Sequence, residues 1–449
     1  MQWNPKAYHL RGVEVLTRQC GAGSLLDPGM GKTSITLAAF TVLQTAGYAK
    51  KMLVVTPIKP MYGTWRQEGQ KWDDFNHLTF TILHGRNKFA GLHDDVDVYL
   101  VNPEGLIDIL NSRDKPEWDV LVIDESTKFK SAKSKRFKEL KRFMSTFYYR
   151  WILTGTITPQ GIIDLFSQVY IMDEGHHLGK YITHYRNKYF YSTGYGGYTY
   201  KPMEGAVDTI TEKIAHMVLR LNAEDYLDMP EFNRILRPVI LSSEVMHTYR
   251  EVEKEFITQI QDKTIVASNM AAAGTKCRQI ANGAVYYDDE GNWKEVHDEK
   301  LQALDEIIEE TSGHPLFILY EFKHDRDRIM KMLGKDAVCI TGMGGTKLEK
   351  TIDDFNSGDL KYLVAHPGSV HGMNIQGYCF HMVWFGVTWN LEHYIQAIWR
   401  LYRQGQSSKM VLCYVLVAQG TLDEKVVKAL DHKDANQQEV EELLQCHHQ

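Results

Sequence analysis

The chain has 449 residues, 43% of them hydrophobic and 24% charged, a composition that excludes wholesale disorder and predicts two or three domains. Its 57 acidic residues outnumber its 51 basic residues, so the protein is not a polycation, and any affinity for nucleic acid must come from local patches. The six cysteines include no C-x-x-C pair, which argues against a disulfide scaffold or a zinc ribbon. Cys446, His447 and His448 could touch a metal, but such donors at a chain end more often have no such role.

The longest apolar runs, such as Met410–Ala418, are much shorter than the ~18 residues that a membrane-spanning helix needs. The first residues contain no basic region followed by an apolar stretch, which a secretory signal would require. The sequence therefore predicts a soluble, monomeric protein of the cytoplasm, or of the host-cell cytoplasm if it is viral, with no membrane partner.

Short apolar runs typical of buried parallel strands recur along the chain, each followed by a longer segment studded with polar residues. The runs are Met52–Thr56, Val96–Val101, Asp119–Ile123, Trp151–Leu153, Leu316–Tyr320, Tyr362–Ala365, Met382–Phe385 and Met410–Val417. Between the first four and the last four lie an aromatic-rich segment, Tyr185–Pro202, and a helical-looking one, Ser243–Gln261. We therefore expect an α/β protein in which a mostly helical insert joins two parallel-sheet lobes.

A glycine-rich turn, Asp27–Thr33, comes directly before a helix-like segment. Because its glycines have no side chain, the backbone N–H groups of the turn can converge on phosphate oxygens. Lys32 could then reach the outer phosphates, and the Thr33 hydroxyl could bind Mg²⁺. The strict pattern G-x-x-x-x-G-K-[ST] fails at its first glycine, where Leu26 stands, so the turn alone could also simply cap a helix. The residues expected to contact the nucleotide are Asp27, Pro28, Gly29, Met30, Gly31, Lys32 and Thr33.

A second signal is the strand-like run Asp119–Ile123, which ends in two adjacent carboxylates. At a strand end, Asp124 can hold the hydrated Mg²⁺ while Glu125 polarises the attacking water. A surface strand that ends in two acids is common by itself, but a phosphate loop followed by such a strand is not, because each supplies what the other lacks. The pair predicts nucleotide hydrolysis with ATP and Mg²⁺ as cofactors.

In their order, these motifs resemble those of the superfamily 2 helicases, specifically the Swi/Snf-type branch of double-stranded DNA translocases. Pro28 stands for the Glu of D-E-x-G-x-G-K-T, Ser126 and Thr127 stand for the Ala-His of D-E-A-H-x-x-K-N-x-x-S, and Ile157 stands for the proline of L-T-G-T-P. The matching segments of the first half are Asp27–Thr33, Met52–Trp72, Asp124–Ser134 and Leu153–Phe166.

The second half continues the resemblance. His366–Gly377 is similar to motif V, and Gln396–Gln406 is similar to Q-A-x-x-R-x-H-R-x-G-Q, with Tyr402 in place of the histidine. The resemblance implies that Arg400 and Arg403 are catalytic, Arg403 as an arginine finger that stabilises charge on the γ-phosphate. It implies further nucleotide contacts at Gly372, Asn374 and Gln396.

The family often has a tyrosine–glutamine pair near the N-terminus, the glutamine reading the adenine edge. Here Tyr8 is kept, but His9 stands at the glutamine position. Because an imidazole cannot reproduce the paired geometry of an amide, the preference for ATP over other nucleotides is left open.

The segment with the strongest local positive charge is Lys128–Arg142, which contains eight basic residues and one acidic residue, Glu139. Lysine and arginine contacts to phosphates give affinity without sequence information, so we expect this run, including Lys128, Lys130 and Lys133, to contact the DNA backbone. The resemblance adds DNA contacts at Lys59, Thr154, Thr156 and Trp389. The tyrosines of Tyr185–Tyr200 could stack on bases, but packing of the insert is the favoured interpretation.

The resemblance implies two RecA-like lobes with the nucleotide between them and DNA across both. The expected boundaries are 1–168 for the first lobe, 169–235 for the insert, 236–432 for the second lobe and 433–449 for a tail. We expect a DNA-dependent ATPase that translocates on duplex or branched DNA and remodels it by branch migration, fork regression or protein displacement, in DNA repair, recombination or replication. The compact form favours a viral or bacterial protein.

Two alternatives stay open. A single-strand or RNA helicase would unwind duplexes, although the D-E-A-D and S-A-T elements typical of RNA helicases are absent from the sequence. A nucleotide-dependent switch would hydrolyse ATP slowly and recruit a partner in one state, although the complete motifs V and VI favour a motor.

Overall fold

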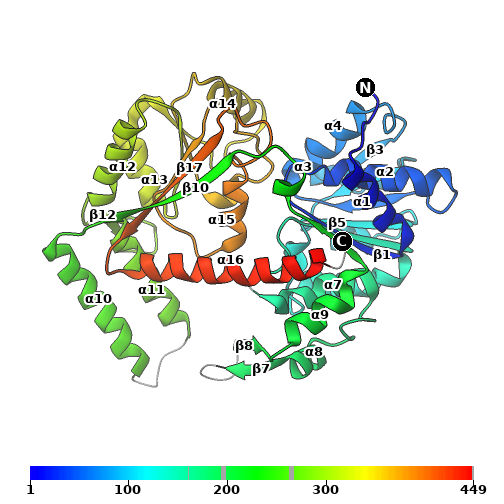
Figure 1. The fold of residues 1–449 in the computed structure, drawn as a ribbon, viewed down its shortest axis with the longest axis horizontal. Helices are drawn as coiled ribbons and strands as arrows, with labels where there is room; N and C mark the ends of the chain where they lie inside the picture. Colours follow the sequence, from blue (N-terminus) through cyan, green and yellow to red (C-terminus); the bar gives the residue numbers. More distant parts are fainter. Residues whose placement is uncertain (160, 194–198, 262–266, 447–449) are drawn as a thin grey trace. The chain divides into compact units, whose positions relative to one another are not determined.

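The computed structural model describes residues 1–159, 161–193, 199–261 and 267–446, with side-chain surroundings for all of these except 255–261, 267–273 and 446 (Figure 1). The chain divides into two compact units. The first comprises Met1–Leu227 and Lys433–Gln449, and the second comprises Asp228–His432.

A seven-stranded sheet forms the centre of the first unit, in the order β3-β4-β2-β5-β6-β1-β9, and every strand pair in it is parallel. Strands β1, β2, β4 and β9 are buried along their whole length, as expected for apolar strands covered on both faces. The strands are β1 (Gly21–Leu26), β2 (Met52–Val55), β3 (Phe80–Leu83), β4 (Val98–Val101), β5 (Val120–Asp124), β6 (Tyr149–Leu153) and β9 (Val218–Leu221).

The helices of the first unit are mostly short. They are α1 (Ala7–Arg18), α2 (Lys32–Thr45), α3 (Ile58–Tyr62), α4 (Thr64–Lys71), α5 (Leu106–Leu110), α6 (Lys135–Leu140), α7 (Leu165–Asp173), α8 (Ile182–Tyr189) and α9 (Ala206–Ala215). An antiparallel hairpin, β7 (Phe190–Thr193) and β8 (Thr199–Pro202), follows α8.

The second unit repeats the plan with a six-stranded sheet in the order β10-β17-β16-β13-β15-β14, again parallel throughout. Its strands are β10 (Glu231–Val239), β13 (Leu316–Leu319), β14 (Ala337–Cys339), β15 (Tyr362–Ala365), β16 (His381–Trp384) and β17 (Met410–Ala418), with a separate hairpin of β11 (Ala284–Tyr286) and β12 (Trp293–Glu295). Its helices are α10 (Ser243–Gln261), α11 (Ala267–Asn282), α12 (Glu299–Glu310), α13 (Lys323–Leu333), α14 (Gly345–Ser357), α15 (Leu391–Ile398) and the start of α16 (Leu422–Cys446).

The expected fold class, two RecA-like lobes with parallel sheets, is confirmed. Each of the eight predicted apolar runs forms a strand, and Ser243–Gln261 is a helix. Strands β1, β3, β9, β10 and β14 were not predicted, since they are short or interrupted by polar residues.

The division of the chain differs from the expected boundaries. Residues 169–227 do not separate from the first lobe: α9 contributes Ile210 and Ile214 to its core, and β9 pairs with β1. The last part of α16 contributes Val440 and Leu444 to the same core. The aromatic segment also packs there through Tyr185 and Tyr189, while residues 194–198 lie outside the described part.

No helix within the described residues is long and apolar enough to cross a membrane. The described residues also contain no group of three or more histidine, cysteine, aspartate or glutamate side chains that could hold a metal ion. Of the C-terminal metal candidates, His447 and His448 lie outside the described residues, as does the side chain of Cys446.

Candidate nucleotide site

The phosphate loop joins the carboxyl end of β1 to the N-terminus of α2. Gly29 and Gly31 have φ angles of 88° and 78°, a left-handed conformation that favours glycine, and Gly31 is the N-cap of the helix. The first N–H groups of a helix have no partner within it, so this N-terminus can bind an anion such as a phosphate. The loop conformation therefore explains the glycines that the sequence shows.

Lys32, the first residue of α2, is held within this loop. Its Nζ donates to the carbonyl oxygens of Leu26 and Asp27, at 2.7 and 3.2 Å. Burial lowers the pKa of Lys32, and the charges of Glu125 and Asp124 oppose this. An ammonium has three donors, so a phosphate oxygen can take the third or replace one of the carbonyls.

Asp124 is the last residue of β5, and two side chains from neighbouring elements orient it. Its Oδ2 accepts hydrogen bonds from Thr56 Oγ1 at 2.8 Å and from Trp65 Nε1 at 3.0 Å. Burial raises the pKa of Asp124, and the bonds from Trp65 and Thr56 lower it. The family motif that contains Trp65 thus serves the acidic pair, with the indole itself fully buried.

Glu125 has φ 57° and ψ 62°, a left-handed conformation that costs energy in a residue other than glycine. Because β1, β2 and β5 are parallel, their carboxyl ends share one edge of the sheet, and the charges of both carboxylates act on Lys32. The first lobe therefore brings together the predicted Lys32, Asp124 and Glu125.

The next turn is linked to the acidic pair through buried polar groups. Ser126 Oγ donates to Gln168 Oε1 at 2.6 Å, and Gln168 Nε2 donates to the carbonyl of Ile157 at 2.8 Å. Gly155 allows a close approach, since a Cβ there would lie 3.1 Å from Pro28 Cδ. The L-T-G-T segment thus approaches the phosphate loop, and Gln168 links Ile157, directly after that segment, to the residue after Glu125.

His9 lies against the phosphate loop, beside the buried Tyr8. Its Nδ1 accepts from the backbone N–H of Lys6 at 3.0 Å, and burial lowers its pKa, which a hydrogen bond to the backbone of Met30 opposes. Both ring nitrogens are thus engaged with the chain's own backbone. In this arrangement His9 supports the loop, and reading of an adenine edge would require one of these bonds to open.

Arg220 belongs to this site, although the sequence did not indicate it. Its Nη1 donates to Asp27 Oδ1 at 2.8 Å, and the backbone N–H of Ala223 donates to Asp27 Oδ2 at 2.8 Å. The signal in the sequence was a single arginine in the apolar run Met217–Leu221, where a buried charge requires a partner. Nothing in the sequence indicates which carboxylate that partner is.

The second lobe holds its two predicted arginines in different ways. Arg400 is buried and donates to the carbonyl oxygens of Gln396, at 2.9 Å, and Met373, at 3.1 Å. Arg403 donates to the side chain of Asn374, and burial lowers its pKa. The structure therefore joins the motif V loop, which also contains Gly372, to the motif VI segment after α15, which contains both arginines.

Comparison with known proteins shows the family. Residues 8–284 match the SNF2-related domain, and residues 299–405 match the helicase conserved C-terminal domain. The first match alone covers more than half of the chain. The chain belongs to the SNF2-related family. It is thus a helicase-like ATPase that uses a nucleotide, and the predicted resemblance is confirmed.

Relatives of this SNF2 protein come from phages, bacteria and eukaryotes. Protein p41 of Acyrthosiphon pisum secondary endosymbiont phage 1 is 33% identical over 429 residues, covering 91% of this chain and 92% of p41. The uncharacterized ATP-dependent helicase YqhH of Bacillus subtilis is 22% identical over 459 residues, which are 94% of this chain and 76% of YqhH. The CHD3-type chromatin-remodeling factor PICKLE of Arabidopsis thaliana is 23% identical over 391 residues, and the match spans only 26% of PICKLE.

Among solved structures, the Sulfolobus solfataricus SWI2/SNF2 ATPase core in complex with dsDNA is 22% identical. The match covers 97% of this chain and 92% of that chain, with a TM-score of 0.46. The fold of this SNF2 protein is assigned from its own two parallel sheets.

The basic run of this SNF2 protein has an apolar inner side and a charged outer side. Phe129, Phe137 and Leu140 are buried, and Arg136 pairs with Glu104 at 2.9 Å. Its exposed lysines are Lys128, Lys133, Lys135 and Lys138, while Lys130 is half-buried. The run, which follows the acidic pair in the sequence, thus forms a surface that can bind an anionic polymer.

The other expected DNA contacts differ in exposure. Lys59, on α3, and Trp389, after β16, are exposed. Thr154 and Thr156 are buried: Thr154 Oγ1 donates to the Thr156 carbonyl at 2.7 Å and accepts from its N–H at 3.1 Å. The two threonine side chains therefore shape the turn and do not lie at the surface where DNA could touch them.

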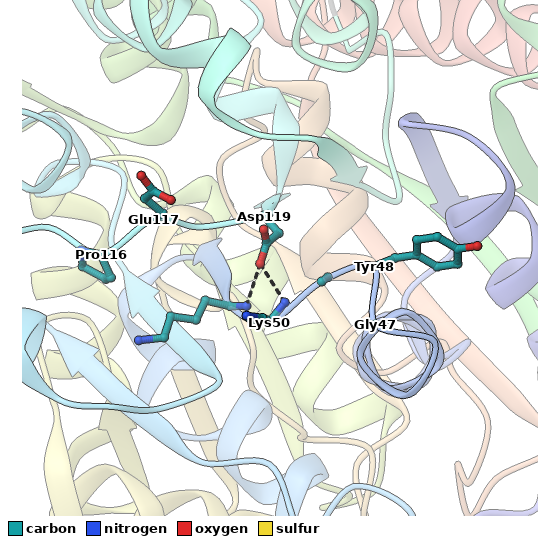
Figure 2. A pocket seen from close by; sticks show the side chains of 8 residues that line it. Gly47, Tyr48, Lys50, Pro116, Glu117 and Asp119 are labelled. Atoms are coloured by element: carbon teal, nitrogen blue, oxygen red, sulfur yellow. Dashed lines mark hydrogen bonds between the residues drawn. The ribbon is translucent and has the colours of Figure 1, made fainter.

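A pocket of about 540 Å³ lies at the opposite edge of the first sheet, before the start of β2 and β5 (Figure 2). It is lined by Gly47, Tyr48, Ala49, Lys50, Lys51, Pro116, Glu117 and Asp119. Asp119 Oδ2 accepts from the backbone N–H groups of Lys50 and Lys51, at 2.7 and 3.1 Å. Because these residues precede the strands whose carboxyl ends carry the site, the pocket is separate from the nucleotide site.

Proposed function

We propose that this SNF2 protein hydrolyses ATP with Mg²⁺ and couples hydrolysis to movement along duplex DNA. The observation that carries the proposal is the continuity of Asp124–Lys138. One segment contains the acidic pair, the turn linked to the L-T-G-T segment and the exposed lysines. A change in nucleotide state at Asp124 can thus be transmitted within one lobe to a surface that suits phosphates.

The residues present fit Mg²⁺. This cation prefers oxygen ligands and is usually held by one or two protein groups together with phosphates and water. The hydrogen bonds from Thr56 and Trp65 end on Asp124 Oδ2 and orient the carboxylate, which would hold the hydrated cation. Thr33, the second residue of α2, would supply a hydroxyl. Bound Mg²⁺ would neutralise charge on the phosphates.

In the proposed reaction, the N-terminus of α2 and Lys32 bind the phosphates, and Glu125 orients the attacking water. Arg403 would stabilise the charge that develops on the transferred phosphoryl group, which makes hydrolysis depend on the second lobe. Arg400 donates to the backbone carbonyls of Gln396 and Met373, so its proposed part is to shape the motif V and VI loops.

We propose duplex remodelling, by branch migration, fork regression or displacement of bound protein, with little separation of long duplexes. A strand-separating enzyme usually carries an added wedge or a domain that traps one strand. Within the expected insert, 169–235, much of the part up to residue 227 packs into the core or sheet of the first lobe, through Tyr185, Ile210, Ile214 and Val218. Exchange of one paired arm for another nearly conserves base pairs, so a duplex translocase can perform it.

The test measures ATP turnover without nucleic acid and then with single-stranded DNA, duplex, fork, four-way junction or RNA. We expect duplex or branched DNA to stimulate most, and the protein to displace a triplex-forming strand and migrate a junction. A variant of the exposed lysines Lys128, Lys133, Lys135 and Lys138 to glutamine should lose this stimulation and keep basal turnover. Efficient unwinding of a long tailed duplex, with triplex and junction untouched, would instead show a single-strand helicase, and equal slow turnover in every arm would show a switch.

A further inference from the structure

A buried chain of charges leads from the C-terminal helix to the phosphate loop. Arg220 lies on β9 opposite Leu25 of β1, and its side chain is only 5% exposed. Its Nη1 donates to Asp27 Oδ1 at 2.8 Å, and its Nη2 donates to Glu441 Oε2 at 2.6 Å. One guanidinium therefore bridges a carboxylate of the phosphate loop and a carboxylate of α16.

The position of Asp27 affects the orientation of Lys32. Its carbonyl oxygen accepts from Lys32 Nζ at 3.2 Å, while its carboxylate is held by Arg220 and by the N–H of Ala223. The charges of Asp27 and Arg220 both act on Lys32. A shift of the Arg220 guanidinium would therefore move the backbone segment that orients the lysine.

Glu441 reaches this position only because the end of α16 packs on the first lobe. Gln437, Val440, Glu441 and Leu444 are buried, and their spacing of three or four residues places them on one face of the helix. Gln445 adds hydrogen bonds to Asn222 at 3.0 Å and Asp225 at 2.9 Å. The face that carries Glu441 is thus the docking face.

The same helix begins in the second unit. Asp423, in its first turn, accepts from the fully buried Lys300 at 2.6 Å within that unit. Residues up to His432 belong to the second unit, and those from Lys433 onward belong to the first. One continuous helix therefore carries a buried ion pair in each lobe, and only the pair in the first lobe leads to the nucleotide site.

We propose that Arg220 is a positioning residue of the nucleotide site and that Glu441 fixes it, so that docking of α16 on the first lobe sets the affinity for ATP. The inference rests on the proposed nucleotide site at Asp27–Thr33. When the helix end is docked, Arg220 is shared between two carboxylates, and Asp27 is held in place. When Glu441 is withdrawn, a buried guanidinium donor loses its partner, and Arg220 moves to regain one.

The test compares Glu441→Ala and Glu441→Gln with the matched control Glu442→Ala, which changes the exposed neighbouring glutamate. We expect Glu441→Ala to raise the KM for ATP about tenfold while kcat at saturating ATP and DNA changes less than twofold. The Gln variant keeps an oxygen acceptor for Arg220 and should fall between the two. Nucleotide affinity measured by direct titration should follow the KM, and the thermal midpoint reports whether each variant is folded.

A double-mutant cycle separates positioning from mere stabilisation. In an Asp27→Asn background, Glu441→Gln should have much less effect on KM, because the path through Asp27 is already broken. Equal effects of Glu441→Gln in both backgrounds, or an unchanged KM in the folded single variant, would overturn the inference. Wild-type turnover in Lys32→Ala would overturn the nucleotide site itself, so the two failures are distinguishable.

Discussion

The two lobes share one sheet plan but hold their charged groups differently. In the first lobe, Lys32 is bonded to backbone carbonyls and Asp124 to Thr56 and Trp65, so both are oriented by the lobe itself. In the second lobe, Arg403 has five N–H donors, and its side-chain partner is Asn374. The difference is that several bonds within the first lobe orient its charged groups, whereas the Arg403 guanidinium is bonded to one amide side chain.

Removal of Lys32 should produce the largest effect. We expect Lys32→Ala to abolish ATP turnover, since the donor that binds the outer phosphates and stabilises the developing charge is lost. The matched control is Lys50→Ala, an exposed lysine at the opposite edge of the same sheet. A steady-state ATPase assay measures both, and comparable turnover in the two variants would contradict the assignment of Lys32.

Substitution of the two arginines of the second lobe should have different effects, one on turnover and the other on stability. Arg403→Ala should lower DNA-stimulated turnover on the order of 10³-fold while the affinity for ATP stays nearly unchanged, because the arginine contacts the phosphoryl group only in the transition state. Arg400→Ala leaves buried carbonyls without a donor and should lower the free energy of unfolding by about 1–3 kcal/mol. Nucleotide titration, ATPase assay and denaturant unfolding measure these effects, and a loss of ATP binding with normal kcat would place Arg403 elsewhere.

Loss of one hydrogen bond that orients Asp124 should have a smaller effect on turnover. Trp65→Phe removes one N–H donor and keeps most of the buried ring, and a hydrogen bond to a charged group contributes about 1.5–3 kcal/mol. We expect kcat to fall about tenfold and ATP affinity to change little. Thr56→Val, which removes the other donor, should act similarly; unchanged kcat in both variants would show that these bonds do not orient the carboxylate.

Titration of Glu441 should change the stability of the fold and leave the chemical step of hydrolysis unaffected. Burial raises its pKa to about 7; Arg220 opposes this and Asp27 adds to it, since one guanidinium faces two carboxylates. An unfolded chain releases this proton near pH 4.3, so between about pH 4.3 and 7 the folded state binds more protons. Stability from this group therefore falls as pH rises, by at most about 1.4 kcal/mol per pH unit.

The Glu441→Gln variant should lack this part of the pH dependence. Denaturant unfolding at several pH values between 5 and 8 measures the slope for the wild type and the variant. Identical slopes would show that Glu441 stays ionised throughout this range.

The sequence predicted the parts of the site that are local in the chain. The phosphate loop and the acidic pair are each a few adjacent residues with a known chemical role, and apolar runs such as Met52–Val55 predicted most strands. Arg220 was missed because its partners lie 193 and 221 residues away in the chain, and no periodicity reports such a distance. The position of β9 was missed because a four-residue strand with a charged residue has no clear pattern.

Burial also limited the prediction for the L-T-G-T segment. Hydroxyl side chains after a strand are equally suited to a surface contact and to a turn that bonds to itself. Only the packing around Thr154 and Thr156 shows that they form the turn.

The placement of β9 and the end of α16 has a consequence for synthesis on the ribosome. The first lobe takes its edge strand from residues near 220 and core side chains from Val440 and Leu444, so it cannot be completed until residue 444 has emerged. The second lobe is contiguous from Asp228 to His432. Domains usually fold in the order in which they leave the ribosome. Here we expect the order to be reversed, with the second lobe folding first and the phosphate loop kept inactive until Val440 and Leu444 have left the ribosome.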